Sequence, residues 1–386
     1  MEGSFNLQIP ARELINVVTM SVSLLVALSL AAPVFRRLSE TKFLALALST
    51  IVVIKLDQLY QMLGGLQAYP AWGFVLTPFQ WLMTPALYAL VLSKTQDDFE
   101  LKRKHFIHLL PSFLSFLYLF FTYFSLPVEE KVNLIAAGWL ALPINRVFIP
   151  VAGDLVQLGY LVAALRIFEA HGIALRSWFS NIEDREYRWL KRIVSLWILI
   201  FSAHLAWVIA AASGVQISFI RSILDVMNFL HLLIALALPI AVLQDRFVLK
   251  VGQRMGTHSE KLVLSAGALN IDVRSEYFGK LQSHMKSSTP FLDPNLTLQL
   301  LADQLALTAR ELSEVINREA GTNFFDFINS YRIDHAKELI ASPSNKRILD
   351  IGLEAGFNSK SAFNDAFKRR VGITPTAYRK SVKKTS

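Results

Sequence analysis

Cysteine is absent from the sequence, and charged residues are scarce. Without cysteine the chain has no disulfide framework, no thiolate zinc site and no cysteine nucleophile. Of its 386 residues only 18% are charged and 53% are hydrophobic, and the mean hydropathy is +0.40. Soluble domains carry about 25% charged and about 45–50% apolar residues. The composition therefore excludes a wholly soluble protein and indicates a membrane protein.

Several chemical motifs are absent as well. The sequence has no glycine-rich phosphate loop, no kinase phosphorylation box, no cluster of metal ligands and no catalytic triad. We therefore expect no enzyme activity, no metal and no cofactor. A retinal-type sensor is excluded too, because its Schiff base needs a lysine in the last apolar run, 222–244, which has none. Residues 1–12 lack the basic segment of a signal peptide, so the first apolar run is expected to stay in the chain.

The net charge of +9 is unevenly distributed. Residues 1–245 hold 18 Lys and Arg against 16 Asp and Glu, whereas residues 246–386 hold 21 against 14. The long apolar part therefore carries +2 and the shorter polar tail +7. Basic charge gathered in a tail indicates a polyanionic partner, either nucleic acid or anionic lipid.

Seven apolar runs are long enough to cross a bilayer, which takes about 20 helical residues. They lie at 13–34, 43–63, 72–92, 106–126, 146–168, 191–212 and 222–244. Lys and Arg of short loops collect on the cytoplasmic side of a membrane. Thirteen of them lie on the side reached after the first, third and fifth runs, against four on the other side. The sequence thus predicts a seven-helix transmembrane domain, residues 1–245, with its N-terminus outside and its tail in the cytoplasm.

Ionisable residues interrupt these apolar runs. Those that are candidates for a common site are Lys55, Asp57, Asp154, His204 and Asp225. A charge in hydrocarbon costs about 2.5–3.5 kcal/mol even on the lenient insertion scale, so such residues usually face a bundle interior. One interpretation is a pocket in the outer half of the membrane that senses a small ligand or protons. The other is that the same residues pair with one another between helices and bind nothing.

The tail has a different pattern, with capping residues between short amphipathic segments. Residues 246–275 are interpreted as a linker and 276–386 as an all-helical domain, so the whole chain is all-α. Thr297 is placed to cap a helix to Leu305, and Thr308 with Glu311 forms a capping box for a second helix that Gly321 ends. Two short helices joined by a tight turn predict a helix-turn-helix, whose second helix enters the DNA major groove.

The same layout is repeated further along the tail. Residues 348–355 form a short predicted helix that Gly356 ends, and 359–371 form a longer one. A last helix is expected to start at Pro375, since proline is tolerated in the first helical turn. A single helix over 324–340 is predicted to connect the two units. Two recognition helices held near one DNA turn, about 34 Å, would read successive major grooves.

The tail resembles the signature of AraC-type transcription regulators over about residues 275–380. The matching positions are Arg332-Ile333, Ala336, Ile340, Ile348, Ile351-Gly352, Gly356-Phe357, Phe363, Phe367, Gly372 and Thr374-Pro375. The stretches 323–329 and 356–361 are similar to the subgroup that carries a membrane-spanning sensor half. No comparable resemblance covers the seven-run half.

The resemblance implies roles for individual residues. Those expected to contact bases are Arg310, Ser313, Lys360, Ser361 and Asn364. Their chemistry agrees, because Arg and Lys suit guanine, Asn suits adenine and Ser is permissive. Those expected to contact phosphates are Lys368, Arg369 and Arg370. The family's use of repeated half-sites also suggests a homodimer, which cross-linking that finds only monomers on DNA would contradict.

The sequence therefore predicts a membrane-bound, one-component transcription regulator of the bacterial inner membrane. Its expected partners are promoter DNA, the lipid bilayer and a small-molecule or physical signal sensed in the membrane half. The alternative is a membrane receptor or transporter whose basic tail binds acidic lipid or a protein partner. A lipid-binding tail needs basic charge but has no use for two capped recognition helices, so the repeated unit favours DNA.

Overall fold

The computed structural model describes residues 11–31, 39–96, 99–182, 187–213, 226, 229–230, 232–234, 236–237, 269–342 and 346–385. Within these residues the regular structure is helical, apart from one isolated β-bridge between Phe179 and Thr297. The chain divides into two units, each described by itself. Unit 1 comprises residues 1–168 and 188–253, and unit 2 comprises residues 169–187 and 254–386.

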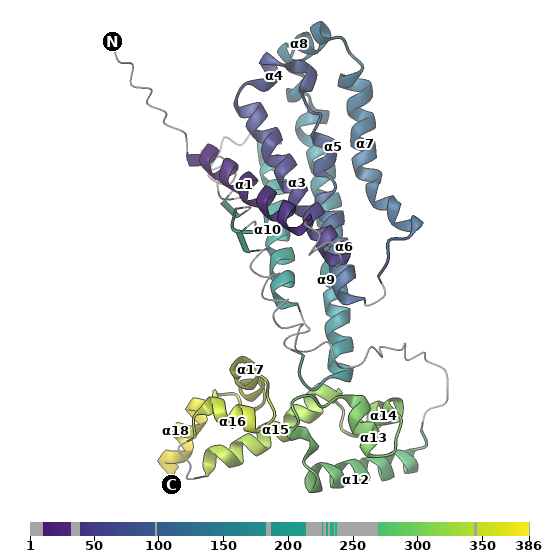
Figure 1. Cartoon of the computed structure of the whole chain (residues 1–386), viewed down its shortest axis with the longest axis vertical. Helices are drawn as coiled ribbons and strands as arrows, with labels where there is room; N and C mark the ends of the chain where they lie inside the picture. Colours follow the sequence, from purple (N-terminus) through teal and green to yellow (C-terminus); the bar gives the residue numbers. More distant parts are fainter. Residues whose placement is uncertain are drawn as a thin grey trace. The chain divides into compact units, whose positions relative to one another are not determined.

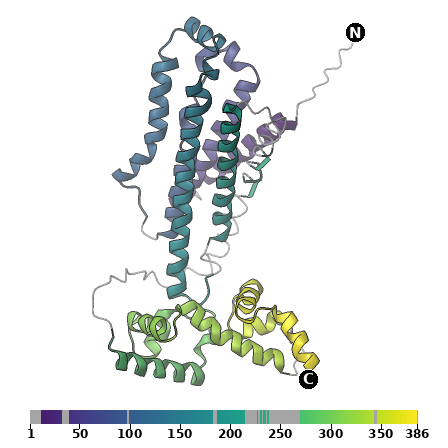
Figure 2. The same cartoon turned by 180° about the vertical axis from the view of Figure 1, so that it is seen from behind.

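Unit 1 consists of long helices, most of which run alongside one another while α1 crosses them obliquely, and several short ones (Figures 1 and 2). The long helices are α1 (Ala11–Ala31), α3 (Ser39–Met62), α6 (Met83–Thr95), α7 (Leu110–Leu119), α9 (Ile149–Trp178) and α10 (Arg188–Ala212). The shorter ones are α4 (Gly65–Ala68), α5 (Thr77–Gln80), α8 (Val128–Ala136), the 3-10 turns Pro70–Trp72, Arg103–Leu109 and Trp139–Ala141, and the π turns Phe120–Phe124 and Ile144–Phe148. α3 packs against both α1 and α6.

Five stretches of the described residues are long and apolar enough to cross a membrane. They are Lys42–Met62, Pro70–Thr95, Arg103–Phe124, Ile144–Trp178 and Arg188–Ala212. They correspond to the second to sixth predicted runs. The first run contains a shorter apolar stretch, Leu14–Ser29, in α1. Most of the seventh, 222–244, lies outside the described residues.

Three of these stretches differ from the uniform helices that the sequence predicts. The fourth run combines the 3-10 turn Arg103–Leu109, α7 and the π turn Phe120–Phe124. The third run is broken into a 3-10 turn, α5 and α6, with Pro78 in the first turn of α5 and Pro85 in that of α6. Proline is accommodated there because the first turn leaves its N–H groups unpaired anyway. α9 continues ten residues past the predicted end at Phe168. Polar residues such as Glu169 end the apolar run, but no proline follows to end the helix.

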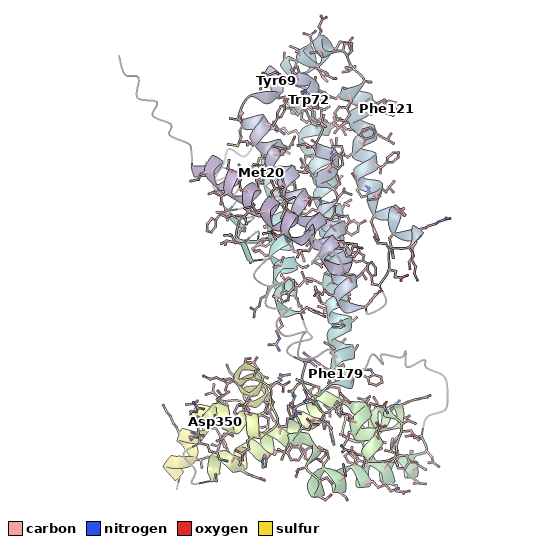
Figure 3. All side chains as sticks on the ribbon, viewed as in Figure 1. Met20, Tyr69, Trp72, Phe121, Phe179 and Asp350 are labelled. Carbon is pink, nitrogen blue, oxygen red and sulfur yellow. The ribbon has the colours of Figure 1, made fainter. Side chains whose placement is uncertain are left out.

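Apolar side chains in unit 1 are found both inside and outside. Leu48 of α3, Leu87 of α6 and Trp197 of α10 are almost completely buried. Phe121, Trp72 and Tyr69, in contrast, project outward and are about 70% exposed (Figure 3). Large apolar side chains facing outward suit contact with lipid, and Trp and Tyr are typical of the membrane interface.

The described part of unit 2 contains the end of α9 and seven further helices. These are α12 (Ile271–Ser287), α13 (Leu298–Gln304), α14 (Ala309–Glu319), α15 (Phe324–Ala341), α16 (Ile348–Glu354), α17 (Lys360–Val371) and α18 (Pro375–Thr385), with a 3-10 turn at Pro290–Leu292. α12 begins at Ile271, four residues before the predicted linker ends, because the Asn270 side chain caps it by accepting from the Asp272 N–H.

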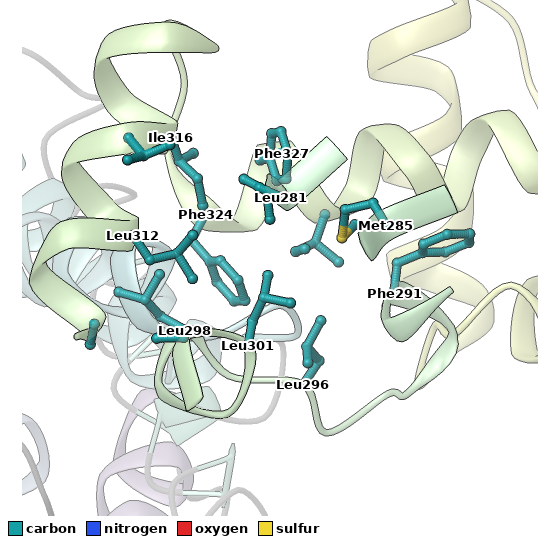
Figure 4. Close-up of a cluster of buried hydrophobic side chains, with 14 residues drawn as sticks. Leu281, Met285, Phe291, Leu296, Leu298, Leu301, Leu312, Ile316, Phe324 and Phe327 are labelled. Atoms are coloured by element: carbon teal, nitrogen blue, oxygen red, sulfur yellow. The ribbon is translucent and has the colours of Figure 1, made fainter. Parts of the chain in front are cut away.

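Two main hydrophobic cores stabilise the described helices of unit 2. The first packs α12, α13, α14 and the start of α15 around Leu281, Leu301, Leu312 and Ile328 (Figure 4). The second packs the end of α15 with α16 and α17; its buried residues include Ile333, Ile340, Ile351, Phe363 and Phe367. α15 takes part in both cores as one continuous helix, as predicted for the connection between the two helix-turn-helix units.

Candidate nucleic-acid interface

The capping residues identified in the sequence set the ends of the two helix pairs. The Thr308 N–H donates to Glu311 Oε2 at 2.8 Å, and the Glu311 N–H donates to Thr308 Oγ1 at 3.2 Å, which completes the predicted capping box. Hydrogen bonds from the Thr308 backbone and hydroxyl lower the pKa of the Glu311 carboxyl. Thr297 and Ser359 cap α13 and α17 without a reciprocal bond: their hydroxyls accept from the N–H groups of Leu300 and Ala362.

In both helix pairs the first helix ends with the same cap, although the second turn is one residue longer. Ala306 follows α13 with φ +54°, and Gly356 follows α16 with φ +90°. In each turn the next N–H donates five residues back, from Leu307 to the Ala302 carbonyl and from Phe357 to the Gly352 carbonyl. α13–α14 and α16–α17 are therefore two copies of one helix-turn-helix unit. The sequence does not predict the left-handed conformation of Ala306, because alanine gives no signal for it.

The first candidate recognition helix, α14, buries one face and presents the other. Leu312, Val315 and Ile316 are completely buried in the first core. Arg310 and Ser313 are half-buried on the remaining surface, and the Ser313 hydroxyl accepts from the Asn317 amide at 3.3 Å. The expected base-contacting residues of this helix therefore lie away from the core, where a DNA groove can reach them.

The second candidate recognition helix, α17, is arranged alike. Phe363 and Phe367 are fully buried, whereas Lys360 and Ser361 are exposed and Asn364 is half-buried. Gly352 on α16 allows this packing, because a Cβ at that position would lie 2.7 Å from a ring carbon of Phe363. Lys360 and Ser361 occupy the first turn of α17, the part of a recognition helix that meets base edges.

The three basic residues expected at phosphates, Lys368, Arg369 and Arg370, lie in the last turn of α17. All three are exposed. Arg369 lies 3.9 Å from Asp326, and Arg370 lies 3.5 Å from Asp334; both carboxylates belong to α15. Exposed ion pairs of this kind contribute only about 0–1 kcal/mol, so a phosphate can replace the carboxylate at little cost.

The polar residues of unit 1 have specific partners. Lys55 is buried and donates to Asn16 Oδ1 and to Gln58 Oε1, both at 3.1 Å. Asp57 accepts from Gln61 at 3.0 Å and from Gln80 at 3.2 Å. These bonds join α3 to α1 and to α5, so each polar side chain is held by amides of its own or a neighbouring helix.

Asp154 and His204 form a further pair, between α9 and α10. His204 Nδ1 lies 2.8 Å from Asp154 Oδ2, and Asp154 is 5% exposed. Gly153 precedes Asp154, and a Cβ added to it would lie 3.1 Å from the Trp81 ring. Trp81 in turn follows Gln80, which is a hydrogen-bond partner of Asp57. The predicted pocket residue Asp225 lies outside the described residues.

Arg332 has a structural role that its sequence position does not reveal. The sequence identifies it only as a residue of the family signature. Its side chain is completely buried on α15 between the two helix-turn-helix units. Its Nε donates to the Phe291 carbonyl at 2.7 Å, and its guanidinium lies 5.7 Å from the centre of the Phe357 ring. Phe291 belongs to the first core and Phe357 to the second. Arg332 therefore contacts residues of both cores where they meet along α15.

Comparison with known proteins agrees with this geometry. Residues 301–381 match a family model described as a helix-turn-helix domain. The melibiose operon regulatory protein of Escherichia coli (strain K12) is 36% identical over 88 residues, which cover 23% of this chain and 29% of that protein. An uncharacterized HTH-type transcriptional regulator of Staphylococcus aureus (strain COL) is 34% identical over 85 residues, covering 22% of this chain and 11% of that protein. No solved structure matches.

These matches confirm the resemblance of the tail. The C-terminal part of the chain carries an AraC-type helix-turn-helix domain, which is a DNA-binding module of transcription regulators and not an enzyme. The chain spans less than a third of the length of these curated relatives. The residues that match the family model lie in unit 2.

Proposed function

We propose that the chain is a membrane-embedded, one-component transcription regulator whose C-terminal domain binds promoter DNA through α14 and α17. The observation that carries the proposal is the repeated helix-turn-helix, with the same cap at the end of the first helix in both copies and one helix, α15, connecting them. The relative from Escherichia coli is named as a regulator of an operon, which supports promoter DNA as the partner.

Replacing one basic residue in each recognition helix tests sequence-specific DNA binding. Arg310→Ala and Lys360→Ala should each weaken binding to the preferred site by about 5-fold to 150-fold, since a good base contact contributes about 1–3 kcal/mol. The measurement is retention of genomic fragments by the purified chain at about 0.15 M salt, because phosphate contacts make affinity strongly salt-dependent.

Lys280→Ala is the matched control for this experiment. It removes the same charge from an exposed position on α12, outside both helix-turn-helix units, where Lys280 pairs with Glu276. Its binding should stay close to that of the parent chain. Retention of all fragments alike, with equal capture by vesicles of acidic lipid, would contradict DNA reading and favour a lipid-binding tail.

We further propose that unit 1 crosses the bacterial inner membrane and controls DNA binding in response to a signal. Five apolar helices of sufficient length and the outward-facing aromatic side chains support insertion. The excess of Lys and Arg in alternate loops supports an external N-terminus and a cytoplasmic DNA-binding domain. Asp154 and His204 support sensing, since buried ionisable residues in membrane helices are usually functional.

Asp154→Asn tests the membrane proposal in cells that carry a promoter reporter. The amide should hold His204 less strongly than the carboxylate does, so reporter output should change while the amount of chain in washed membranes stays constant. Glu129→Gln, which removes one negative charge at the start of α8, is the control and should have no effect. A parent chain in the soluble fraction would contradict insertion, and unchanged output of Asp154→Asn would contradict a sensing role for this pair.

A further inference from the structure

The end of α9 and the residues that follow it pack into the same unit as the DNA-binding domain. Residues 169–187 belong to unit 2, although they are separated from the rest of that unit by more than 60 residues of chain. We call residues 175–182 the docking segment. Figure 3 shows its residue Phe179 at the end of α9. By the order of the predicted runs, the segment lies in a loop on the cytoplasmic side.

Backbone and side-chain hydrogen bonds connect the docking segment to the first helix-turn-helix unit. Phe179 forms the antiparallel bridge with Thr297, the capping residue of α13. The Ser180 N–H and hydroxyl both donate to the Leu296 carbonyl, at 3.3 and 2.6 Å. Ser180 is only 1% exposed. The segment therefore pairs through its backbone with the residues just before α13, in the manner of a short antiparallel strand.

Asn181 extends this contact to the second unit. Its amide nitrogen donates to the Pro294 carbonyl at 2.6 Å and to the Gly356 carbonyl at 3.3 Å. Pro294 precedes α13, and Gly356 forms the turn between α16 and α17. One side chain of the docking segment thus contacts both the residues that lead into α13 and the turn of the second helix-turn-helix unit.

The docking segment also completes the surroundings of the buried Arg332. An arginine carries five N–H donors, and its hydrogen bonds here reach five acceptors. Phe291 and Asp293 supply two of the acceptors, both backbone carbonyls. The docking segment supplies the other three: the Ser180 carbonyl and the Asn181 amide oxygen, both at 3.1 Å, and the Ser180 hydroxyl at 3.0 Å. Without the segment, the buried cation would lose these three acceptors.

Apolar contacts surround these polar ones. Leu175 and Ile182 are buried against Phe325 of α15, and Phe179 packs beside them. Trp178 packs against the first core. Phe325 belongs to neither main core. Its apolar neighbours in this cluster all come from the docking segment. A buried apolar cluster and a satisfied buried arginine together make a specific interaction surface.

We propose that this surface of the DNA-binding domain is a receptor for the docking segment and holds the domain to the end of α9. The occupant is residues 175–182 of the same chain. The regulatory consequence rests on the function proposed above: a movement of α9 reaches both helix-turn-helix units directly, through Ser180, Asn181 and Arg332, and does not depend on the 246–268 connection alone.

Cutting that connection tests the docking without using DNA. A protease site is inserted between Arg254 and Ala268 of the full chain in membranes, and the cut membranes are washed at about 0.5 M salt to screen adhesion of the basic domain to lipid. The parent domain should stay with the membranes. Leu175→Glu should reduce the retained amount by about tenfold or more, because it places a carboxylate against Phe325.

Ile173→Glu is the matched control, since Ile173 is 70% exposed two residues earlier on α9. The domain should be retained as in the parent chain. Equal retention of the Leu175→Glu and Ile173→Glu domains, or release of the parent domain, would overturn the proposal. Neither result would affect DNA binding by Arg310 and Lys360, so a failure of docking is distinguishable from a failure of the proposed function.

A disulfide provides a second measurement, which detects the docking by a covalent bond and not by the loss of a contact. The chain has no native cysteine, and residues paired across a bridge lie at about 4.5–5.5 Å between Cα atoms, within the range of a disulfide. Phe179→Cys with Thr297→Cys should therefore keep the two cut fragments together on a non-reducing gel. Phe179→Cys with Lys280→Cys should not, and equal cross-linking of the two pairs would overturn the docking.

Discussion

Arg332→Ala is expected to cost the DNA-binding domain about 3–5 kcal/mol of its free energy of unfolding. Removing the guanidinium has this effect because several buried polar groups would stay without partners, and each such group costs about 1–3 kcal/mol. Here the carbonyls of Phe291, Asp293 and Ser180 would lose their donor. Domains are stable by only about 5–15 kcal/mol, so the loss is a large part of the total.

The measurement is pulse proteolysis of the full chain in urea, which reports the folded fraction of the domain. Arg332→Lys should fall between the parent and Arg332→Ala, because lysine keeps the charge but lacks the planar fork that reaches several acceptors. Lys337→Ala, a half-buried position on the same helix paired with Asp334, is the control and should change stability by no more than about 0.5 kcal/mol. A loss below about 1 kcal/mol in Arg332→Ala would show that Arg332 does not join the two cores.

Gly356→Ala is expected to have the next largest effect. The backbone at Gly356 has φ +90°, which strains any residue with a Cβ by about 1–2 kcal/mol. In addition, a Cβ would lie 2.5 Å from the Phe291 carbonyl oxygen and 2.9 Å from Arg332 Nε. Backbone cannot move aside as a flexible side chain can, so the turn between α16 and α17 must shift. We expect a total loss of about 3 kcal/mol or more and weaker DNA binding by α17.

Gly372→Ala separates the two causes. Gly372 has φ +86° after α17, but a Cβ added there would have no heavy atom within 4 Å in the part of the chain that the structure describes. Gly372→Ala should therefore show the backbone strain alone, about 1–2 kcal/mol, in the same urea measurement. If Gly356→Ala cost no more than Gly372→Ala, the close approach of the turn to Phe291 and Arg332 would have no energetic role.

The local elements of the DNA-binding domain could be predicted because their signals are local. Thr308 and Glu311 are three residues apart, and their reciprocal hydrogen bonds form wherever a helix starts there. Ser359 and Pro375 mark helix starts for the same reason. The matches over residues 301–381 confirm the family resemblance that these positions suggested.

The polar residues of unit 1 show the opposite case. Their placement within apolar runs indicates that they need partners, but not which ones. Lys55 and Asp57 are two residues apart on α3 and are held by different amides, Asn16 and Gln58 for one and Gln61 and Gln80 for the other. Helix rotation and packing decide such pairs, and a single sequence does not specify them.

Composition and short-range spacing were enough to establish the split into an apolar half and a basic tail, the capped helices of the tail and its repeated unit. Each of these depends on overall residue content or on residues within one helical turn of each other. Packing in three dimensions was needed to show that Ser180 and Asn181 meet Arg332, 152 and 151 residues further along. Small polar residues after a helix have no pattern that names a distant partner, because the hydrogen bonds exist only once α13, α15 and the α16–α17 turn have packed together.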